Sequence, residues 1–196
     1  PGTADRAWLA FRERTRQNAR LSVKVQTFAA LAAVVGAVAV PQLFHVLGAV
    51  SGLGTSLGEI FLPMHLPIML VGLLAGPYAG AAAGLLGPLC SFALSGMPGI
   101  AMLPFMMIEL GVYGLTAGLL RHVKLPTIAK VVITQVAGRA VRAAAILLAT
   151  YAFGSRSLPV AVIWTSIATG AFGIVLQWTL LPLLVYRVEN RKSHEQ

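Results

Sequence analysis

Three charged residues stand inside otherwise apolar stretches of the sequence: Glu109, Arg139 and Arg142. A charge at membrane depth is costly, and it is usually retained to contact a partner, a ligand or a water-filled cavity. If these stretches are helices, Arg139 and Arg142 stand about 13 and 18 Å beyond Lys130, and Glu109 stands about 16 Å from Leu120. The carboxylate is then level with both guanidiniums, so one arginine can pair with it while the other stays available. Two interpretations remain open: a buried ion pair that locks two helices, or a ligand pocket in which the surplus arginine meets an acceptor or an anion.

Other polar and aromatic residues fall in the same stretches. Tyr113 follows Glu109 on the same helix face, while Gln135, Gln177 and Trp178 lie in the last two stretches. An amide in hydrocarbon needs a partner, so the two glutamines are either clamps between helices or groups that read a ligand. Four methionines near a Gly-Pro loop either fill the core or form a soft lid over an aromatic or heterocyclic ligand. They are Met97, Met102, Met106 and Met107.

The sequence lacks recognisable catalytic motifs. It has no Gly-x-x-x-x-Gly-Lys-[Ser/Thr] phosphate loop, no His-Glu-x-x-His metal motif and no Gly-x-Ser-x-Gly nucleophile motif. Its four histidines, His45, His65, His122 and His194, are scattered over different stretches. We therefore expect neither an enzyme, nor a cofactor, nor a metal site.

The elements that must position these residues follow from the composition. Of the 196 residues, 57% are hydrophobic and 11% are charged, whereas soluble domains average roughly 25% charged residues. A membrane-crossing helix takes about 20 residues, and six apolar stretches fit, at residues 25–47, 62–75, 78–94, 100–120, 126–153 and 158–186. The prediction is an all-α integral membrane protein, a six-transmembrane-helix bundle. The second and third stretches are short, which suggests tilt or an irregular start near Pro63 and Pro67.

The net charge of +9 is distributed unevenly along the chain. With the N-terminus in the cytoplasm, most of the 15 Lys and Arg residues fall on the cytoplasmic side, and Arg156 falls on the other. The cytoplasmic set is Arg6, Arg12, Arg14, Arg16, Arg20, Lys24, Arg121, Lys124, Lys130, Arg187, Arg191 and Lys192. The positive-inside rule then predicts that both termini are cytoplasmic, and it removes the case for nucleic acid as a partner.

Three regions result: a basic cytoplasmic tail at 1–24, a membrane domain at 25–188 and a cytoplasmic C-terminal tail at 189–196. The first tail is either solvated or a short helix that lies on anionic lipid, with Ala7, Trp8 and Phe11 on one side.

Small residues form two stripes with a four-residue period. One comprises Ala29, Ala33 and Ala37, and the other comprises Gly72, Gly76, Gly80 and Gly84. Such stripes allow helices to approach closely. They usually serve packing within one chain, but a stripe on the first helix could face a separate subunit.

Several motifs together resemble one family. They are Leu62-Pro-Met-His-Leu-Pro67, Gly76-Pro-Tyr-Ala-Gly80, Ser95-Gly-Met-Pro98, Met107-Ile-Glu-Leu110, Tyr113-Gly-Leu-Thr-Ala-Gly118, Ala137-Gly-Arg139 and Gly173-Ile-Val-Leu-Gln177. Over residues 25–188 the chain resembles the substrate-binding S components of energy-coupling factor (ECF) vitamin transporters.

The resemblance implies a six-helix S component in a bacterial or archaeal cell (inner) membrane. Such a subunit captures a micronutrient from outside in a pocket closed by outer loops. It then docks on a transmembrane T component driven by two cytoplasmic ATPase subunits, and topples to release its cargo.

Matched to the family's motifs, Met97, Glu109, Tyr113, Arg139 and Gln177 become pocket residues. Arg142 joins them on height alone, and Gln135 and Trp178 complete the expected substrate-binding set. The family's Ala-x-x-x-Ala contact with the T component falls on Ala29 and Ala33, with Ala37 as an extension.

The substrate and the mode of energy coupling stay open at this point. Glutamate, arginine, glutamines and aromatics favour a flat heterocycle such as queuine or pyridoxine, whereas the surplus arginine would equally suit a carboxylate, as in pantothenate. The alternative function is a solitary secondary carrier coupled to protonation of Glu109.

Overall fold

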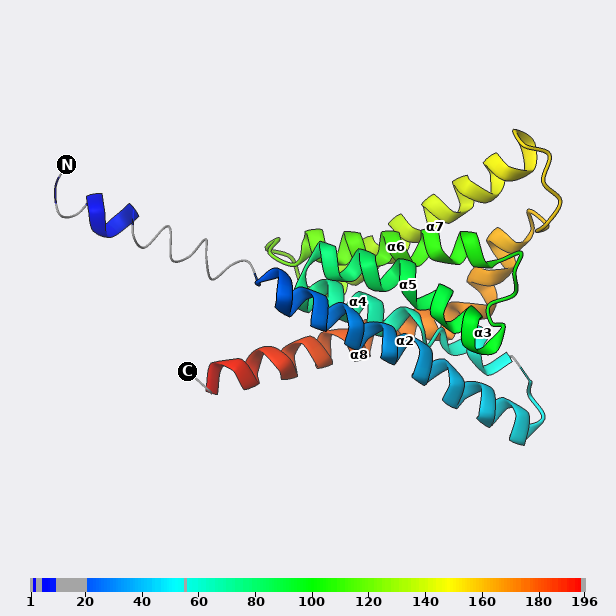
Figure 1. The fold of residues 1–196 in the computed structure, drawn as a ribbon, viewed down its shortest axis with the longest axis horizontal. Coiled ribbons are helices and arrows are strands. Elements are labelled where there is room, and N and C mark those ends of the chain that lie inside the picture. Colours follow the sequence, from blue (N-terminus) through cyan, green and yellow to red (C-terminus); the bar gives the residue numbers. More distant parts are fainter. Residues whose placement is uncertain (1, 3–4, 10–20, 55, 195–196) are drawn as a thin grey trace.

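The computed structural model describes residues 2, 5–9, 21–54 and 56–194. These residues form helices joined by short turns, with no strand in the described ranges, as predicted. After a short helical segment at 5–9, the elements are α2 (Val23–Ser51), α3 (Ser56–Phe61), α4 (His65–Ala75), α5 (Pro77–Ser95), α6 (Leu103–Leu120), α7 (Thr127–Tyr151) and α8 (Val162–His194) (Figure 1). Most of the basic N-terminal tail, Phe11 included, lies outside the described residues.

Helix ends follow local sequence signals. Ser22 caps α2 by accepting a hydrogen bond from the backbone N–H of Val25, and Gly52 ends the helix in the left-handed conformation. Gly76, with φ of 105°, makes the sharp turn from α4 into α5, whose first residue is Pro77. Gly96 ends α5 in the left-handed conformation.

Five helices in the described part of the chain are long and apolar enough to cross a membrane: α2, α5, α6, α7 and α8. The second predicted span is different, because the chain breaks at Leu62, which has a positive φ of 49°, and at Pro63. Helix α4 therefore has only 11 residues, about 17 Å of rise against a hydrocarbon core of about 30 Å. The irregular start expected near Pro63 and Pro67 lies at this break.

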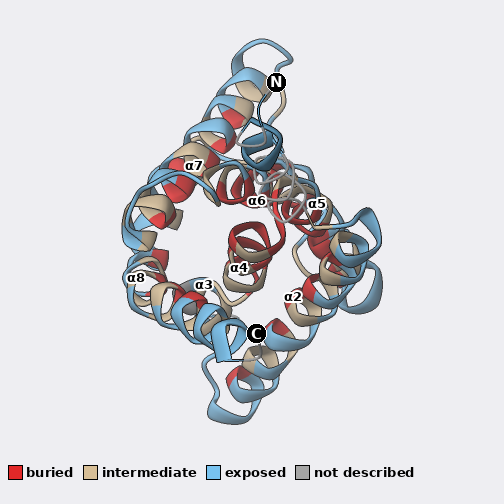
Figure 2. Cartoon of the chain, turned by 90° about the vertical axis from the view of Figure 1, so that its left-hand side faces the viewer, coloured by how far each residue is buried: buried red, intermediate tan, exposed pale blue. Residues whose placement is uncertain are grey.

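Helix α4 occupies the middle of the bundle. Figure 2 shows α4 surrounded by the other helices and coloured largely as buried. It packs against α2, α5, α6 and α8, and it contributes Ile68 and Met69, both fully buried, to the main hydrophobic core. The short helix is thus the element around which the longer ones assemble.

The glycine stripe packs α5 and α4 onto α6. A Cβ placed on Gly80 would collide with the backbone of Gly114, and one on Gly84 would collide with the carbonyl of Leu110. A Cβ on Gly72 would lie 2.6 Å from the carbonyl oxygen of Gly114. Only glycine permits these helices to approach so closely, so this stripe serves internal packing.

The alanine stripe of α2 also turns inward. Ala33 and Ala37 are 8% and 0% exposed and belong to the core that α2 shares with α4 and α5. Ala29 is half-buried at the edge of that core. The small side chains of Ala33 and Ala37 thus let α2 lie close to α4 and α5.

The two ends of the bundle carry different segments. The start of α2, the end of α8 and the α6–α7 turn lie at one end, which we call the basic end (Figure 1). The α2–α3, α5–α6 and α7–α8 connections lie at the opposite end, which we call the loop end (Figure 1). Lys24, Arg121, Lys124 and Arg187 thus gather at the basic end, and Arg156 lies at the loop end.

Candidate functional site

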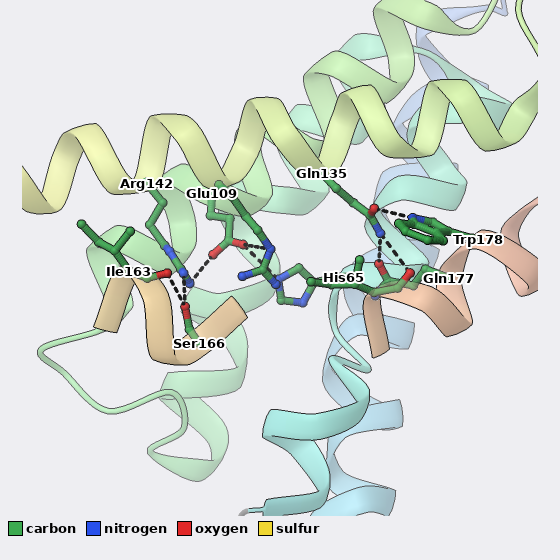
Figure 3. Close-up of polar contacts among 10 residues, drawn as sticks. His65, Glu109, Gln135, Arg142, Ile163, Ser166, Gln177 and Trp178 are labelled. Atoms are coloured by element: carbon green, nitrogen blue, oxygen red, sulfur yellow. Dashed lines mark hydrogen bonds and ion pairs between the residues drawn. The ribbon is translucent and has the colours of Figure 1, made fainter. Parts of the chain in front are cut away.

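The predicted pairing of Glu109 with an arginine is present, and Arg142 is the partner. Glu109 lies on α6 and is 1% exposed. The Nη1 of Arg142, on α7, donates to the Oε2 of Glu109 over 2.8 Å. The Nη2 of Arg142 donates to the Oγ of Ser166 on α8 (Figure 3). Arg142 therefore joins three helices through two of its three nitrogens, and its buried Nε has no hydrogen-bond partner among the described residues.

Arg139 is the arginine in surplus. Its Nε lies 4.0 Å from the Oε1 of Glu109, beyond hydrogen-bond distance, and its side chain is 11% exposed. Its Nε and Nη1 are buried and have no hydrogen-bond partner among the described residues. Arg142 thus makes two side-chain hydrogen bonds, whereas the buried Nε and Nη1 of Arg139, on the same helix face, make none with the described residues.

His65 is a member of the cluster that the sequence interpretation missed. It is the first residue of α4, and its Nε2 lies 3.4 Å from the Oε1 of Glu109 (Figure 3). Its ring also meets the ring of Tyr113 edge-on, with centroids 5.2 Å apart. Because the histidines are scattered along the sequence, none of them is linked to Glu109 by spacing. The sequence feature that could have pointed to His65 is its place between Pro63 and Pro67, where the helix begins.

Tyr113 packs beside the charged cluster, between His65 and Gly138. A Cβ added to Gly138 of α7 would fall within the Tyr113 ring, so the ring occupies the space that this glycine leaves. Tyr113 is 1% exposed and does not line the cavity described below. Its ring meets His65 and packs α6 against α7.

A cavity of about 430 Å³ opens beside the charged cluster. Its polar wall includes His65, Glu109, Arg139, Arg142 and Ser166, and it also carries Ser91 of α5 and Thr165 and Thr169 of α8. Its apolar wall includes Pro41, Leu62, Met64, Met97, Pro98, Met102 and Met106. Met97 and Pro98, in the loop after α5, are thus among the residues that line the cavity. The hydroxyls of α8 were missed because single serines and threonines in an apolar helix give no distinctive signal.

The two glutamines lie apart from this cavity. The Nε2 of Gln135 donates to the Oε1 of Gln177 over 2.9 Å and to the carbonyl of Ile174 over 3.3 Å. The indole N–H of Trp178 donates to the Oε1 of Gln135 over 2.7 Å (Figure 3). Of the two open interpretations, the structure supports the clamp: these side chains tie α7 to α8. Gln135, Gln177 and Trp178 are not among the residues lining the cavity.

Within the described residues, no group of three or more His, Cys, Asp or Glu side chains is placed to hold a metal ion. The chemistry that the cluster offers is recognition: fixed donors and acceptors at the edge of an apolar cavity, inside a bundle of membrane-crossing helices. These features define a membrane protein that binds a small solute.

Comparison with known proteins names the class. Residues 22–185 match the family model of the ECF transporter, substrate-specific component. The chain belongs to the family of ECF transporter substrate-specific components, as its motifs predicted. No curated protein and no solved structure matched the chain. Members of the family are substrate-binding subunits of vitamin and micronutrient transporters rather than enzymes, and this chain is accordingly a multi-pass cell-membrane protein.

Proposed function

We propose that this chain captures one small water-soluble micronutrient with high affinity, in the cavity beside Glu109, and delivers it to an ECF T component with two ATPase subunits. The observation that carries the proposal is the cavity itself. Its 430 Å³ lies within the range of small-molecule sites. A cavity with fixed polar groups selects well, because a wrong ligand leaves buried donors or acceptors unpaired.

The proposed topology has six helices in the membrane, with α4 as a short internal sixth. Both termini are cytoplasmic, in a bacterial or archaeal inner membrane, because most of the described Lys and Arg residues lie at the basic end. The cavity is bordered by His45, six residues before the end of α2, by Glu59 of α3, by Met97 in the α5–α6 loop and by Val162 at the start of α8. All four belong to the loop end, so the cavity would face outside, with the methionine-bearing loop as its lid.

The T-component contact is proposed for the outward edge of α2 that carries Ala29. Ala33 and Ala37 serve this contact indirectly, since their small side chains let α2 lie close to α4 and α5. Energy would come from the partner ATPases, because the chain has no phosphate-binding loop of its own.

The cavity is tested by filling it. Ser91 lines the cavity, whereas Ser95, one turn further along α5, is exposed and does not. Ser91→Leu should remove the small molecule that co-purifies with the wild-type protein, measured by mass spectrometry, and Ser95→Leu should retain it. Equal retention by both variants would show that the ligand binds elsewhere.

Uptake into liposomes tests the mode of transport. The chain with its T component and ATPases should transport the bound compound only when ATP is present on the side of the membrane that carries the ATPase subunits. Uptake by the chain alone, driven by a proton gradient, would instead establish the solitary carrier.

A further inference from the structure

The charges that line the cavity do not balance. Its inner wall carries two guanidiniums, Arg139 and Arg142, against the single buried carboxylate of Glu109. The other acidic residue on the cavity wall, Glu59, is exposed on α3 at the loop end. With His65 neutral, the buried part of the site has a formal charge of +1, from two arginines and one glutamate.

The surplus charge can be assigned to one group. The Oε2 of Glu109 accepts a hydrogen bond from Arg142, whose second terminal nitrogen donates to Ser166, so that only the Nε of Arg142 is buried without a partner. Arg139 keeps Nε and Nη1 without acceptors, although both atoms are buried. A buried guanidinium without an acceptor is expensive, so the site is complete only when something supplies one.

The chemistry of a guanidinium specifies that acceptor. Its planar fork matches the two oxygens of a carboxylate, which can accept two parallel hydrogen bonds. The cavity lining also includes Met97, Met102, Met106 and Pro98, which offer polarizable and apolar surface, beside the hydroxyls of Ser91, Thr165 and Thr169. The cavity therefore fits a molecule with an anionic end and an apolar body.

We infer that the substrate is a small organic carboxylate, anchored through its carboxylate by Arg139, with an apolar body under the methionine-bearing loop. This inference rests on the proposed function and specifies the substrate class of the same site. It favours an acid over the neutral heterocycle that residue types alone favoured. Arg142 is a positioning residue here: it holds Glu109, which in turn leaves Arg139 facing the ligand.

Matched pairs of acids and neutral analogues test the inference. Binding to the full chain in lipid nanodiscs is measured calorimetrically for pantothenate and pantothenol, biotin and biotinamide, and indole-3-acetate and indole-3-acetamide. Pyridoxine and queuine represent heterocycles without a carboxylate. We expect binding only among the acids. Arg139→Gln should weaken that binding at least about 30-fold, Arg139→Lys less so, since lysine keeps the charge but loses the fork.

Arg156→Gln is the matched control, because it removes the same charge from an exposed position at the loop end; it should bind as the wild type does. If Arg139→Gln does not fold, the comparison of acid with neutral analogue in the wild type decides. A neutral analogue that binds as tightly as its acid, or an Arg139→Gln variant with wild-type affinity, would overturn the inference.

Different results would contradict the proposed capture function and the carboxylate inference. If pyridoxine or queuine binds, and Ser91→Leu abolishes that binding, the capture function stands and the carboxylate inference falls. If no probe binds, the molecule extracted from purified wild-type protein decides: an acid supports the inference, and a neutral or cationic compound overturns it. If no molecule is extracted either, both proposals are contradicted.

Discussion

The pairing of Glu109 with Arg142 rather than Arg139 can be measured with two double-mutant cycles. One combines Glu109→Gln with Arg142→Gln, and the other combines Glu109→Gln with Arg139→Gln. The arginines lie on the same face of α7 and carry the same charge, so each cycle is the control for the other. Only the geometry toward Glu109 differs.

The magnitudes follow from the distances. At an effective dielectric constant of about 20, Coulomb's law gives about 6 kcal/mol for charges 2.8 Å apart and about 4 kcal/mol for charges 4.0 Å apart. The difference of about 2 kcal/mol agrees with the roughly 1.5–3 kcal/mol that a hydrogen bond to a charged group contributes. Removing one member of a buried pair costs about 3–5 kcal/mol, and the Glu109/Arg142 double variant should cost clearly less than the sum of the single ones.

The assay is equilibrium unfolding in mixed micelles of dodecylmaltoside with increasing SDS. Tryptophan fluorescence reports the free energy of unfolding, and Trp178 lies at the contact of α7 with α8. We expect the Arg142 cycle to exceed the Arg139 cycle by about 2 kcal/mol of coupling free energy. Coupling energies equal within about 0.5 kcal/mol, or a larger value for Arg139, would refute the assignment of Arg142 as the partner of Glu109.

Three further predictions concern the packing around the site. Gly138→Ala should lower the melting temperature strongly, because its Cβ would overlap the Tyr113 ring. Gly36→Ala is the control and should be tolerated, because its Cβ would meet Pro67 at an ordinary 3.7 Å. Similar melting temperatures for the two variants would contradict this packing. Gln135→Leu should reduce the free energy of unfolding by about 1–2 kcal/mol and leave ligand affinity unchanged, since Gln135 lies outside the cavity. A loss of ligand affinity, measured by calorimetry, would instead show that Gln135 contacts the ligand. Ala37→Leu should destabilise the chain by about 1–3 kcal/mol in the same micelle assay, because the side chain of Ala37 is fully buried. Wild-type stability combined with loss of T-component binding would instead show that Ala37 contacts the T component.

Much of the fold follows from composition and turn residues. Lipid requires every backbone polar group to be satisfied within the segment, so apolar runs of sufficient length become helices, as α2 and α5 to α8 are. Gly52, Gly76 and Gly96 then end helices where the sequence suggests. The break at Leu62 was less predictable, because an apolar run gives the same signal whether or not one of its residues adopts a positive φ.

The site was only partly predictable. Helical rise places Glu109 level with the two arginines, and in the structure its carboxylate lies within 4.0 Å of both guanidiniums. Rise does not specify how far each helix is rotated about its axis, so it could not say which arginine pairs with the carboxylate. In a membrane bundle nearly all helix faces are apolar, so sequence periodicity indicates rotation only weakly.

By itself, the sequence determined the class of protein: a helical membrane subunit of a known transporter family, with charged residues inside its apolar segments. Tertiary structure decided which groups these charges meet. It brings His65 from the central helix to Glu109, turns Ala33 and Ala37 into the core, and sets Gln135 apart as a clamp. The physical reason is that close glycine contacts between helices fix their rotation and depth, and those contacts form only between segments distant in the sequence.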